Sequence, residues 1–291
     1  METTIRFWGV RGSIASPGAH TVRTGGNTSC VEVQCGETTL VLDAGTGMRA
    51  LGERMLAEGR REATILLSHL HWDHIQGLPF FLPAWLGGHR LTFAGMPGLR
   101  GALDAQMQPP CFPVRLSDMS AELHFRELGS ELSVGDVRVR AAKLNHPGGV
   151  LGYRIEHAGT SVVYATDTEH YSCPDPHLVA LAKDADVLIY DAMYTEDEYA
   201  GRVGPSKVGW GHSTWEAGVA VADAANVGRL VLFHHDPVRD DAAVDALERA
   251  AALRRPGTVA AREGDALVLR PDQGSRGRGS DSARGGERRA A

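Results

Sequence analysis

The chain has 291 residues, of which 43% are hydrophobic, 23% charged and 6% aromatic, a composition typical of a globular protein and not of a fibrous or disordered one. No apolar run reaches the roughly 18 residues that a membrane span needs, and the N-terminus lacks a secretory signal, so we expect a cytoplasmic protein. No membrane partner is expected, and the acidic net charge of −6 argues against a long nucleic acid as a partner.

The first part of the chain is predicted to be mostly β structure. The pattern of polar and apolar residues predicts strands at 5–10, 29–35 and 38–43, with a turn at 36–37. The Gly/Ser/Pro-rich segment 12–26 is a predicted loop, long enough to be functional. A helix is expected at 48–58, and the apolar strand 64–67 then leads directly into a group of histidines.

The remainder of the chain mixes strands and helices. Further strands are predicted at 90–94, 122–128, 137–144, 152–156, 161–165, 187–190, 229–233 and 265–270. Helices are predicted at 99–107, 178–184, 214–226 and 242–254. Because each half contains strands followed by helix–strand alternation, we expect two sheets packed together with helices outside.

The C-terminal residues 271–291 differ in composition from the rest. They hold five arginines, three acidic residues and no aliphatic side chain larger than alanine, so their charge is +2 and residues 1–270 carry −8. Such a segment buries too little apolar surface to offset its ordering entropy, and we predict a disordered basic tail. Residues 1–270 are predicted to form one domain, because candidate ligands spread along them must converge on one site.

A cluster of four polar residues follows the predicted strand 64–67. In an extended chain residues two apart point to the same side, so His69 and His71 can bind one cation, while Asp73 and His74, past the bend, can bind a second. Three imidazoles and a carboxylate within six residues would be costly to bury without a metal. This set of ligands suits zinc.

Further candidate residues stand at the ends of other predicted elements. His146, Asp167 and His234 each follow a predicted strand, and His212 precedes the Ser213–Glu216 start of a helix. Open sheets collect ligand-binding groups at strand ends, so these residues are candidates for the same site.

These residues resemble the metallo-β-lactamase superfamily. The order His69-x-His71-x-Asp73-His74, His146, Asp167, His234 is similar to its dinuclear phosphodiesterase branch, which includes ribonuclease Z and the cyclic phosphodiesterases of phosphonate degradation. The resemblance covers roughly residues 4–270 and implies an α+β fold, an αββα sandwich of two mixed β-sheets with helices on the outer faces. Homodimers are common in this branch, so the analogy also allows for a homodimer.

The resemblance implies two divalent metal ions, Zn²⁺ first and Mn²⁺ as the alternative. It assigns one ion to His69, His71 and His146, the other to Asp73, His74 and His234, and makes Asp167 the bridge between them.

The resemblance also implies roles beside the metals. The segment 211–214 is similar to the His-Ser-Thr motif of ribonuclease Z, where the histidine assists proton transfer, which makes His212 a candidate catalytic residue. Asp191 matches the acidic position that orients this histidine. Asp43 matches a family carboxylate that lies behind the ligands.

The ligands predict the chemistry. Two cations lower the pKa of a bridging water roughly from 15.7 to near 7, supply a hydroxide nucleophile and neutralise phosphodiester oxygens as charge develops. Departure of the alkoxide then needs a proton, for which His212 oriented by Asp191 is the candidate donor. Asp73 can help to position the water from its metal site.

The nature of the substrate is predicted from what the chain lacks. Ribonuclease Z carries a long arm that grips tRNA, in many members between the positions of His146 and Asp167. Here these two residues are only 21 positions apart, and a predicted hairpin fills the segment between them. We therefore predict a small phosphodiester, with cyclic nucleotides as the leading class. The alternatives are a tRNA 3′-processing endoribonuclease, a lactonase-type or other hydrolase of this fold, and a non-catalytic metal-binding signalling protein.

Several residues are weaker candidates for contact with substrate. Arg11 and Asn27 flank the loop 12–26 and could bring donors to a phosphate or base. His235 follows His234 directly, and its side chain is expected to point the other way, toward substrate or behind the ligands. Trp72, between two ligands, is expected to pack under the site, and the segment 194–210 could act as a lid.

Overall fold

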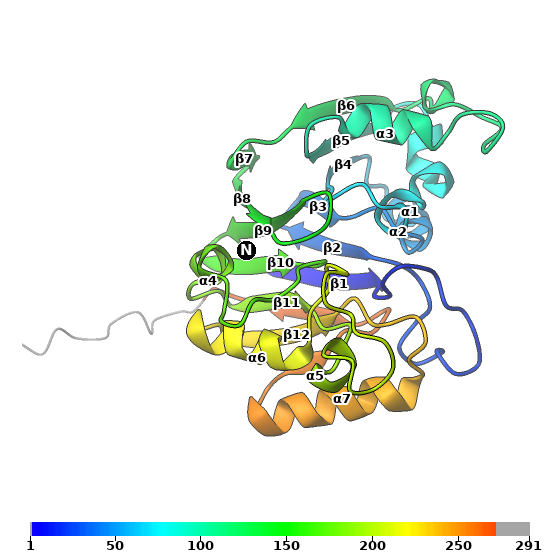
Figure 1. Cartoon of the computed structure of the whole chain (residues 1–291). Coiled ribbons are helices and arrows are strands. Elements are labelled where there is room, and N and C mark those ends of the chain that lie inside the picture. The colour runs from blue at the N-terminus through cyan, green and yellow to red at the C-terminus, as the bar shows by residue number, and fades with distance from the viewer. Residues whose placement is uncertain (1, 272–291) are drawn as a thin grey trace, which may run out of the picture.

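The computed structural model describes residues 2–271, which form two facing β-sheets flanked by helices (Figure 1). The first sheet has the strand order β14-β1-β2-β3-β4-β5-β6, and the second has the order β13-β12-β11-β10-β9-β8-β7. Both sheets are mixed. The strands β3 to β6 run parallel in the first sheet and β10 to β13 run parallel in the second, while the others pair antiparallel.

The strands of the first sheet are β1 (Thr3–Gly9), β2 (Cys30–Cys35), β3 (Thr38–Leu42), β4 (Glu62–Leu66), β5 (Arg90–Gly95), β6 (Glu122–Glu127) and β14 (Ala266–Leu269). Those of the second are β7 (Glu131–Val134), β8 (Val137–Leu144), β9 (Val150–His157), β10 (Thr160–Ala165), β11 (Val187–Asp191), β12 (Arg229–Phe233) and β13 (Val259–Ala260). The helices are α1 (Met48–Ala57), α2 (Trp72–Ile75), α3 (Leu99–Ala105), α4 (Pro176–Ala182), α5 (Glu196–Tyr199), α6 (Trp215–Ala224) and α7 (Asp241–Arg254). Short 3₁₀ helices lie at Leu78–Phe80, Leu82–Trp85 and Leu116–Asp118.

Three layers of apolar side chains hold the structure together. Alternate residues of facing strands, such as Phe7 and Phe233, fill the space between the two sheets. A second layer lies between the outer face of the second sheet and the helices α4, α6 and α7. A third lies between the first sheet and the helices α1 and α3. The predicted αββα sandwich, an α+β fold, is confirmed.

The predicted elements agree with the structure except for short ones. The strands β8 and β12 begin and end at the predicted residues, and the predicted hairpin between His146 and Asp167 is formed by β9 and β10. The prediction did not include α2, α5, β7 or β13, because four residues or fewer carry too little periodicity. Within residues 2–271 no helix is long and apolar enough to cross a membrane. The predicted basic tail falls, beyond Pro271, outside the described residues.

Candidate metal centre

The candidate site lies where several strands of both sheets end on the same side. The histidine cluster follows β4, which is parallel to β3, and Asp43 follows β3. In the second sheet His146, Asp167 and His234 come after β8, β10 and β12. The strands β10, β11 and β12 are parallel, so their carboxyl ends reach one edge and bring distant residues together.

Seven of the predicted residues form two adjoining groups. We call the first group the open cluster: the side-chain nitrogens of His69, His71 and His146 lie within 4.8 Å of one another. His71 is exposed, and its Nδ1 is 3.2 Å from Nε2 of His146. Two imidazole nitrogens that face each other in this way leave a position for a shared cation.

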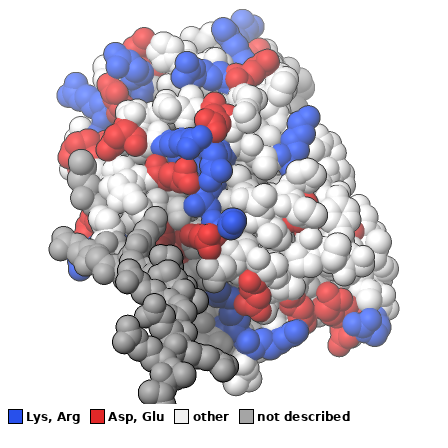
Figure 2. Space-filling model, turned by 90° about the vertical axis from the view of Figure 1, so that its left-hand side faces the viewer, with Lys and Arg blue, Asp and Glu red and all other residues white. Residues whose placement is uncertain are grey.

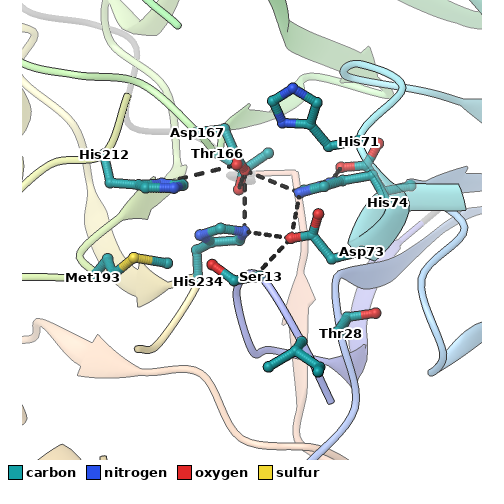
Figure 3. Close-up of polar contacts among 12 residues, drawn as sticks. Ser13, Thr28, His71, Asp73, His74, Thr166, Asp167, Met193, His212 and His234 are labelled. Carbon is teal, nitrogen blue, oxygen red and sulfur yellow. Dashed lines mark hydrogen bonds and ion pairs between the residues drawn. The ribbon is translucent and has the colours of Figure 1, made fainter. Parts of the chain in front are cut away.

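The second group, which we call the buried cluster, contains Asp73, His74, Asp167 and His234, all buried and also within 4.8 Å of one another. Oδ2 of Asp167 is 3.2 Å from Nε2 of both His74 and His234 (Figure 3). Oδ1 of Asp167 is 3.8 Å from Nε2 of His69. One carboxylate oxygen thus faces each cluster. This is the geometry that a bridging ligand requires.

The donor atoms of both clusters fit metal ions. Nε2 of His69, His74 and His234 is buried without a hydrogen-bond partner among the described residues, a costly state for imidazole unless it ligates a cation. Burial holds the pKa of His69 well below its ordinary value, so its lone pair is free. Burial acts against ionisation of Asp167. Its pKa is nevertheless held well below the usual range by the nearby imidazoles of His234, His74 and His69, so Asp167 is a carboxylate.

Three residues at strand ends have a left-handed backbone conformation, which directs their side chains toward the site. Asp43, Asp167 and His234 have φ of 62°, 51° and 58°. Non-glycine residues in this left-handed region cost roughly 1–3 kcal/mol each and are concentrated at functional sites. The chain turns sharply as it leaves β3, β10 and β12.

Asp43 lies directly behind the buried cluster. Its Oδ2 accepts hydrogen bonds from Tyr164 Oη, Ser68 Oγ and His74 Nδ1, all at 2.8 Å, and its Oδ1 accepts from the backbone N–H of Ser68 at 2.7 Å. Hydrogen bonding of Nδ1 to Asp43 leaves Nε2 of His74 as the atom directed into the buried cluster.

His212 and Asp191 meet beside the buried cluster. Nδ1 of His212 lies 2.9 Å from Oδ2 of Asp191, and the His212 ring stacks on the ring of His234 at a centroid distance of 5.1 Å. Burial disfavours the charged imidazolium, but Asp191, together with Asp167 and Asp73, raises the pKa of His212 to about 9. A histidine that keeps its proton in this position can act as an acid.

The structure does not place the three weaker candidates in the clusters. The buried guanidinium of Arg11 donates to the backbone carbonyls of Gly25, Asp236 and Arg239. Nδ2 of Asn27 donates to Glu263. His235 is also buried, with Nε2 at 2.9 Å from the carbonyl of Ala261, and burial lowers its pKa to about 3. These side chains hold loops together.

The loop 12–26 nevertheless reaches the site through its backbone. The backbone N–H of Ser13 donates to Oδ2 of Asp73 at 2.8 Å (Figure 3). A Cβ on Gly12 would lie 2.5 Å from the ring of His234, so only glycine permits this approach. Trp72 was expected to pack under the site, but the structure shows it 75% exposed.

One residue that contacts the site indirectly was not predicted from the sequence. Glu169 accepts hydrogen bonds from the backbone N–H groups of Gly209 and Gly211 and from the hydroxyl of Tyr199. The carbonyl of Gly211 in turn lies 2.8 Å from Nδ1 of His146. Glu169 stands two residues after Asp167, and that proximity was the one signal available in the sequence.

Comparisons with known proteins agree with this architecture. Residues 38–235 match the family described as the beta-lactamase superfamily domain. The chain is 30% identical over 225 residues to ribonuclease Z of Mycobacterium sp. (strain KMS). The matched region covers 70% of this chain and 76% of that protein.

Two solved structures share the fold. One is the metallo-beta-lactamase fold protein YhfI from Bacillus subtilis, with a TM-score of 0.71 and 21% identity, covering 92% of this chain and 99% of that one. The other is a diphosphatase of the PhnP family, with a TM-score of 0.65 and 18% identity, covering 91% and 97%.

Proposed function

Because the chain belongs to the metallo-β-lactamase superfamily, in its ribonuclease Z-like branch, and is a hydrolase of this fold, we propose that it is a two-metal phosphodiesterase acting on a small phosphodiester, with cyclic nucleotides as the leading class. The observation that carries the proposal is the contact between His212 and Asp191 beside two adjoining His/Asp clusters. A lactonase would need the clusters but has no use for a proton donor at this position.

The fold family implies divalent metal ions, and the two clusters fit them. We assign one ion to His69, His71 and His146, and the other to Asp73, His74 and His234, with Asp167 between them. Zn²⁺ suits these ligands, and Mn²⁺ is the alternative. When bound, the two ions would activate a water as nucleophile and neutralise the charge that develops on the phosphate oxygens.

The chain's own residues supply the rest of the reaction. In this proposal His212 gives its proton to the departing oxygen, and Asp191 holds Nδ1 so that Nε2 is the atom that meets the substrate. Asp73, fixed by the N–H of Ser13, orients the attacking water. The exposed edge of His71 marks the side from which substrate enters.

Two features favour a small substrate. The β9–β10 hairpin fills the segment between His146 and Asp167, so no long arm projects there. Residues 1–270 carry a net charge of −8, which disfavours a long nucleic acid as the substrate. Figure 2 shows the opposite end of the strands from the clusters, where Lys and Arg side chains are interspersed with Asp and Glu.

A tRNA 3′-processing endoribonuclease is the second candidate, because the curated relative that the chain matches at 30% identity is a ribonuclease Z. The non-catalytic alternative is disfavoured, since all seven ligand positions are filled by His or Asp.

An activity panel with Zn²⁺ or Mn²⁺ tests the proposal. Cyclic nucleotides, linear dinucleotides and bis(p-nitrophenyl) phosphate should be hydrolysed, and precursor tRNA should not be cleaved at its 3′ end. Cleavage of precursor tRNA with the small diesters left intact would establish the second candidate.

The variant His212→Ala tests the proton donor. Hydrolysis of an unactivated diester should fall about 10²- to 10⁴-fold, whereas hydrolysis of bis(p-nitrophenyl) phosphate should change little because nitrophenolate departs without a proton. Equal losses on both substrates would remove His212 from this role.

A further inference from the structure

Lys207 stands between two aromatic rings next to His212. Its Nζ lies 4.0 Å from the ring centroid of Trp210 and 5.6 Å from that of Tyr194. The Tyr194 ring in turn contacts the His212 ring edge-on, with centroids 6.1 Å apart. The ammonium group is thus held by its attraction to two aromatic faces, one aromatic ring away from the proposed proton donor.

This lysine has no acidic partner, unlike the arginines near it. Arg202 pairs with Asp197, and Arg239 pairs with Glu198. For Lys207, no carboxylate within residues 2–271 lies within ion-pair distance. Lys207 is half-buried and Trp210 beside it is 52% exposed, so the pair lies at the surface, where a ligand can approach. A positive charge placed by aromatic rings and left without a counter-charge is suited to bind an anion.

The segment that carries Lys207 is anchored on both sides. The N–H of Lys207 donates to the carbonyl of Tyr199, and the N–H of Trp210 donates to the carbonyl of Lys207. Glu169 accepts from the Tyr199 hydroxyl at 2.6 Å and from the N–H groups of Gly209 and Gly211 at 2.6 and 2.9 Å. Lys207 therefore lies inside a loop that is fixed before substrate binds, which reduces the entropy cost of binding.

The position of Lys207 indicates which part of a substrate it would meet. His212 stacks on His234 of the buried cluster, and Tyr194 and then Lys207 follow outward. Because His212 would protonate the departing oxygen, a group that reaches Lys207 belongs to the leaving side of the scissile bond. The exposed Trp210 beside it offers a face on which a base could stack.

Resting on the proposed function, we propose that Lys207 binds a second phosphate on the leaving-group side of the substrate, so that the substrate class is a diester with two phosphates. Within cyclic nucleotides this means cyclic dinucleotides. A cyclic mononucleotide has one phosphate, which the metal clusters would occupy, and it leaves Lys207 without a ligand.

The test uses three linear dinucleotides that differ only in a terminal phosphate: ApA, pApA and ApAp. The wild-type protein should hydrolyse one of the two phosphorylated dinucleotides with a kcat/KM about tenfold above that for ApA, mainly through KM. Lys207→Ala should abolish this preference and leave hydrolysis of ApA and of bis(p-nitrophenyl) phosphate unchanged, while Lys207→Arg should restore part of it. Equal kcat/KM for all three dinucleotides in the wild type would overturn the proposal.

A matched control is provided by Lys183→Ala, which removes the same charge from an exposed residue after α4. This variant should retain the preference. A general effect of charge would instead weaken it in both variants and would overturn the specific role of Lys207.

Dinucleotide binding, measured in the presence of a chelator so that no turnover occurs, separates this inference from the proposed function. The wild type should bind the preferred dinucleotide about tenfold more tightly than ApA, and Lys207→Ala should bind both alike. If this difference is seen while no diester is hydrolysed with metal present, the phosphodiesterase proposal fails and the phosphate site stands. If ApA is hydrolysed but the difference is missing, the phosphate site fails alone.

Discussion

The open and buried clusters share one edge of the sandwich but differ in charge and access. The open cluster consists of imidazoles, with His71 exposed and His146 half-buried. The buried cluster includes two carboxylates, Asp73 and Asp167, and Asp43 lies directly behind His74. The carboxylates of the site therefore lie around the buried position and not around the exposed one.

This difference has a physical consequence for the two metal ions. A dication in the buried cluster would be compensated by two carboxylates in a medium of low dielectric constant, where the attraction is strong. A dication in the open cluster would be bound by neutral imidazoles and one oxygen of Asp167, and water competes there. We infer that the buried position binds its ion more tightly, whereas the open position exchanges ligands more readily.

Replacing Asp167, the carboxylate shared by both clusters, should abolish the difference in metal affinity between them. In Asp167→Ala we expect both ions to be lost and hydrolysis of bis(p-nitrophenyl) phosphate to fall at least about 10³-fold, because each cluster loses an oxygen ligand. Metal analysis of the purified variant measures this. Unchanged metal content would contradict the bridging assignment.

Removing the support behind His74 should affect one cluster only. In Asp43→Asn we expect the affinity for one of two ions to fall roughly 10- to 100-fold, because His74 loses a charged partner at Nδ1. Competition with a chelating dye measures both affinities. Glu32→Gln, which neutralises a buried carboxylate paired with Arg60, serves as the control and should leave both unchanged.

Asp191 tests how the buried cluster affects its neighbour His212. A raised pKa means that His212 keeps its proton up to about pH 9 and loses it above. In Asp191→Asn this pKa should fall, so hydrolysis of an unactivated diester should decline at a lower pH than in the wild type and be about tenfold slower at pH 8. The pH–rate profile of Asp191→Asn, compared with that of the wild type, measures this. An alkaline limb that stays in place would show that Asp191 does not act through His212.

Release of the ions should show the smallest effect. With a chelator in excess, we expect two phases that differ by a few-fold or more in rate, the faster one from the open cluster. In His71→Ala the fast phase should disappear while the slow phase remains. A single phase for both ions in the wild type would contradict the inferred difference.

Much of the site could be predicted because its residues stand in patterns. Candidate ligands at spacings of one and two residues after an apolar strand, and single residues at the ends of later strands, are visible in the sequence. The partners of Arg11, Asn27 and His235 were not visible, because backbone carbonyls and a glutamate from distant segments accept their hydrogen bonds. Tyr164 gave no signal either, since a tyrosine in a buried strand has the pattern of a core residue.

The sequence by itself therefore determined the types and order of the candidate ligands and the α+β sandwich that carries them, because both depend on periodicity and local spacing. Only the tertiary structure decided which cluster is buried, that Asp167 faces both, and that Glu169 fixes the loop of Lys207. These features depend on which strand ends meet across two sheets. Burial and charge compensation arise there from residues far apart in the chain.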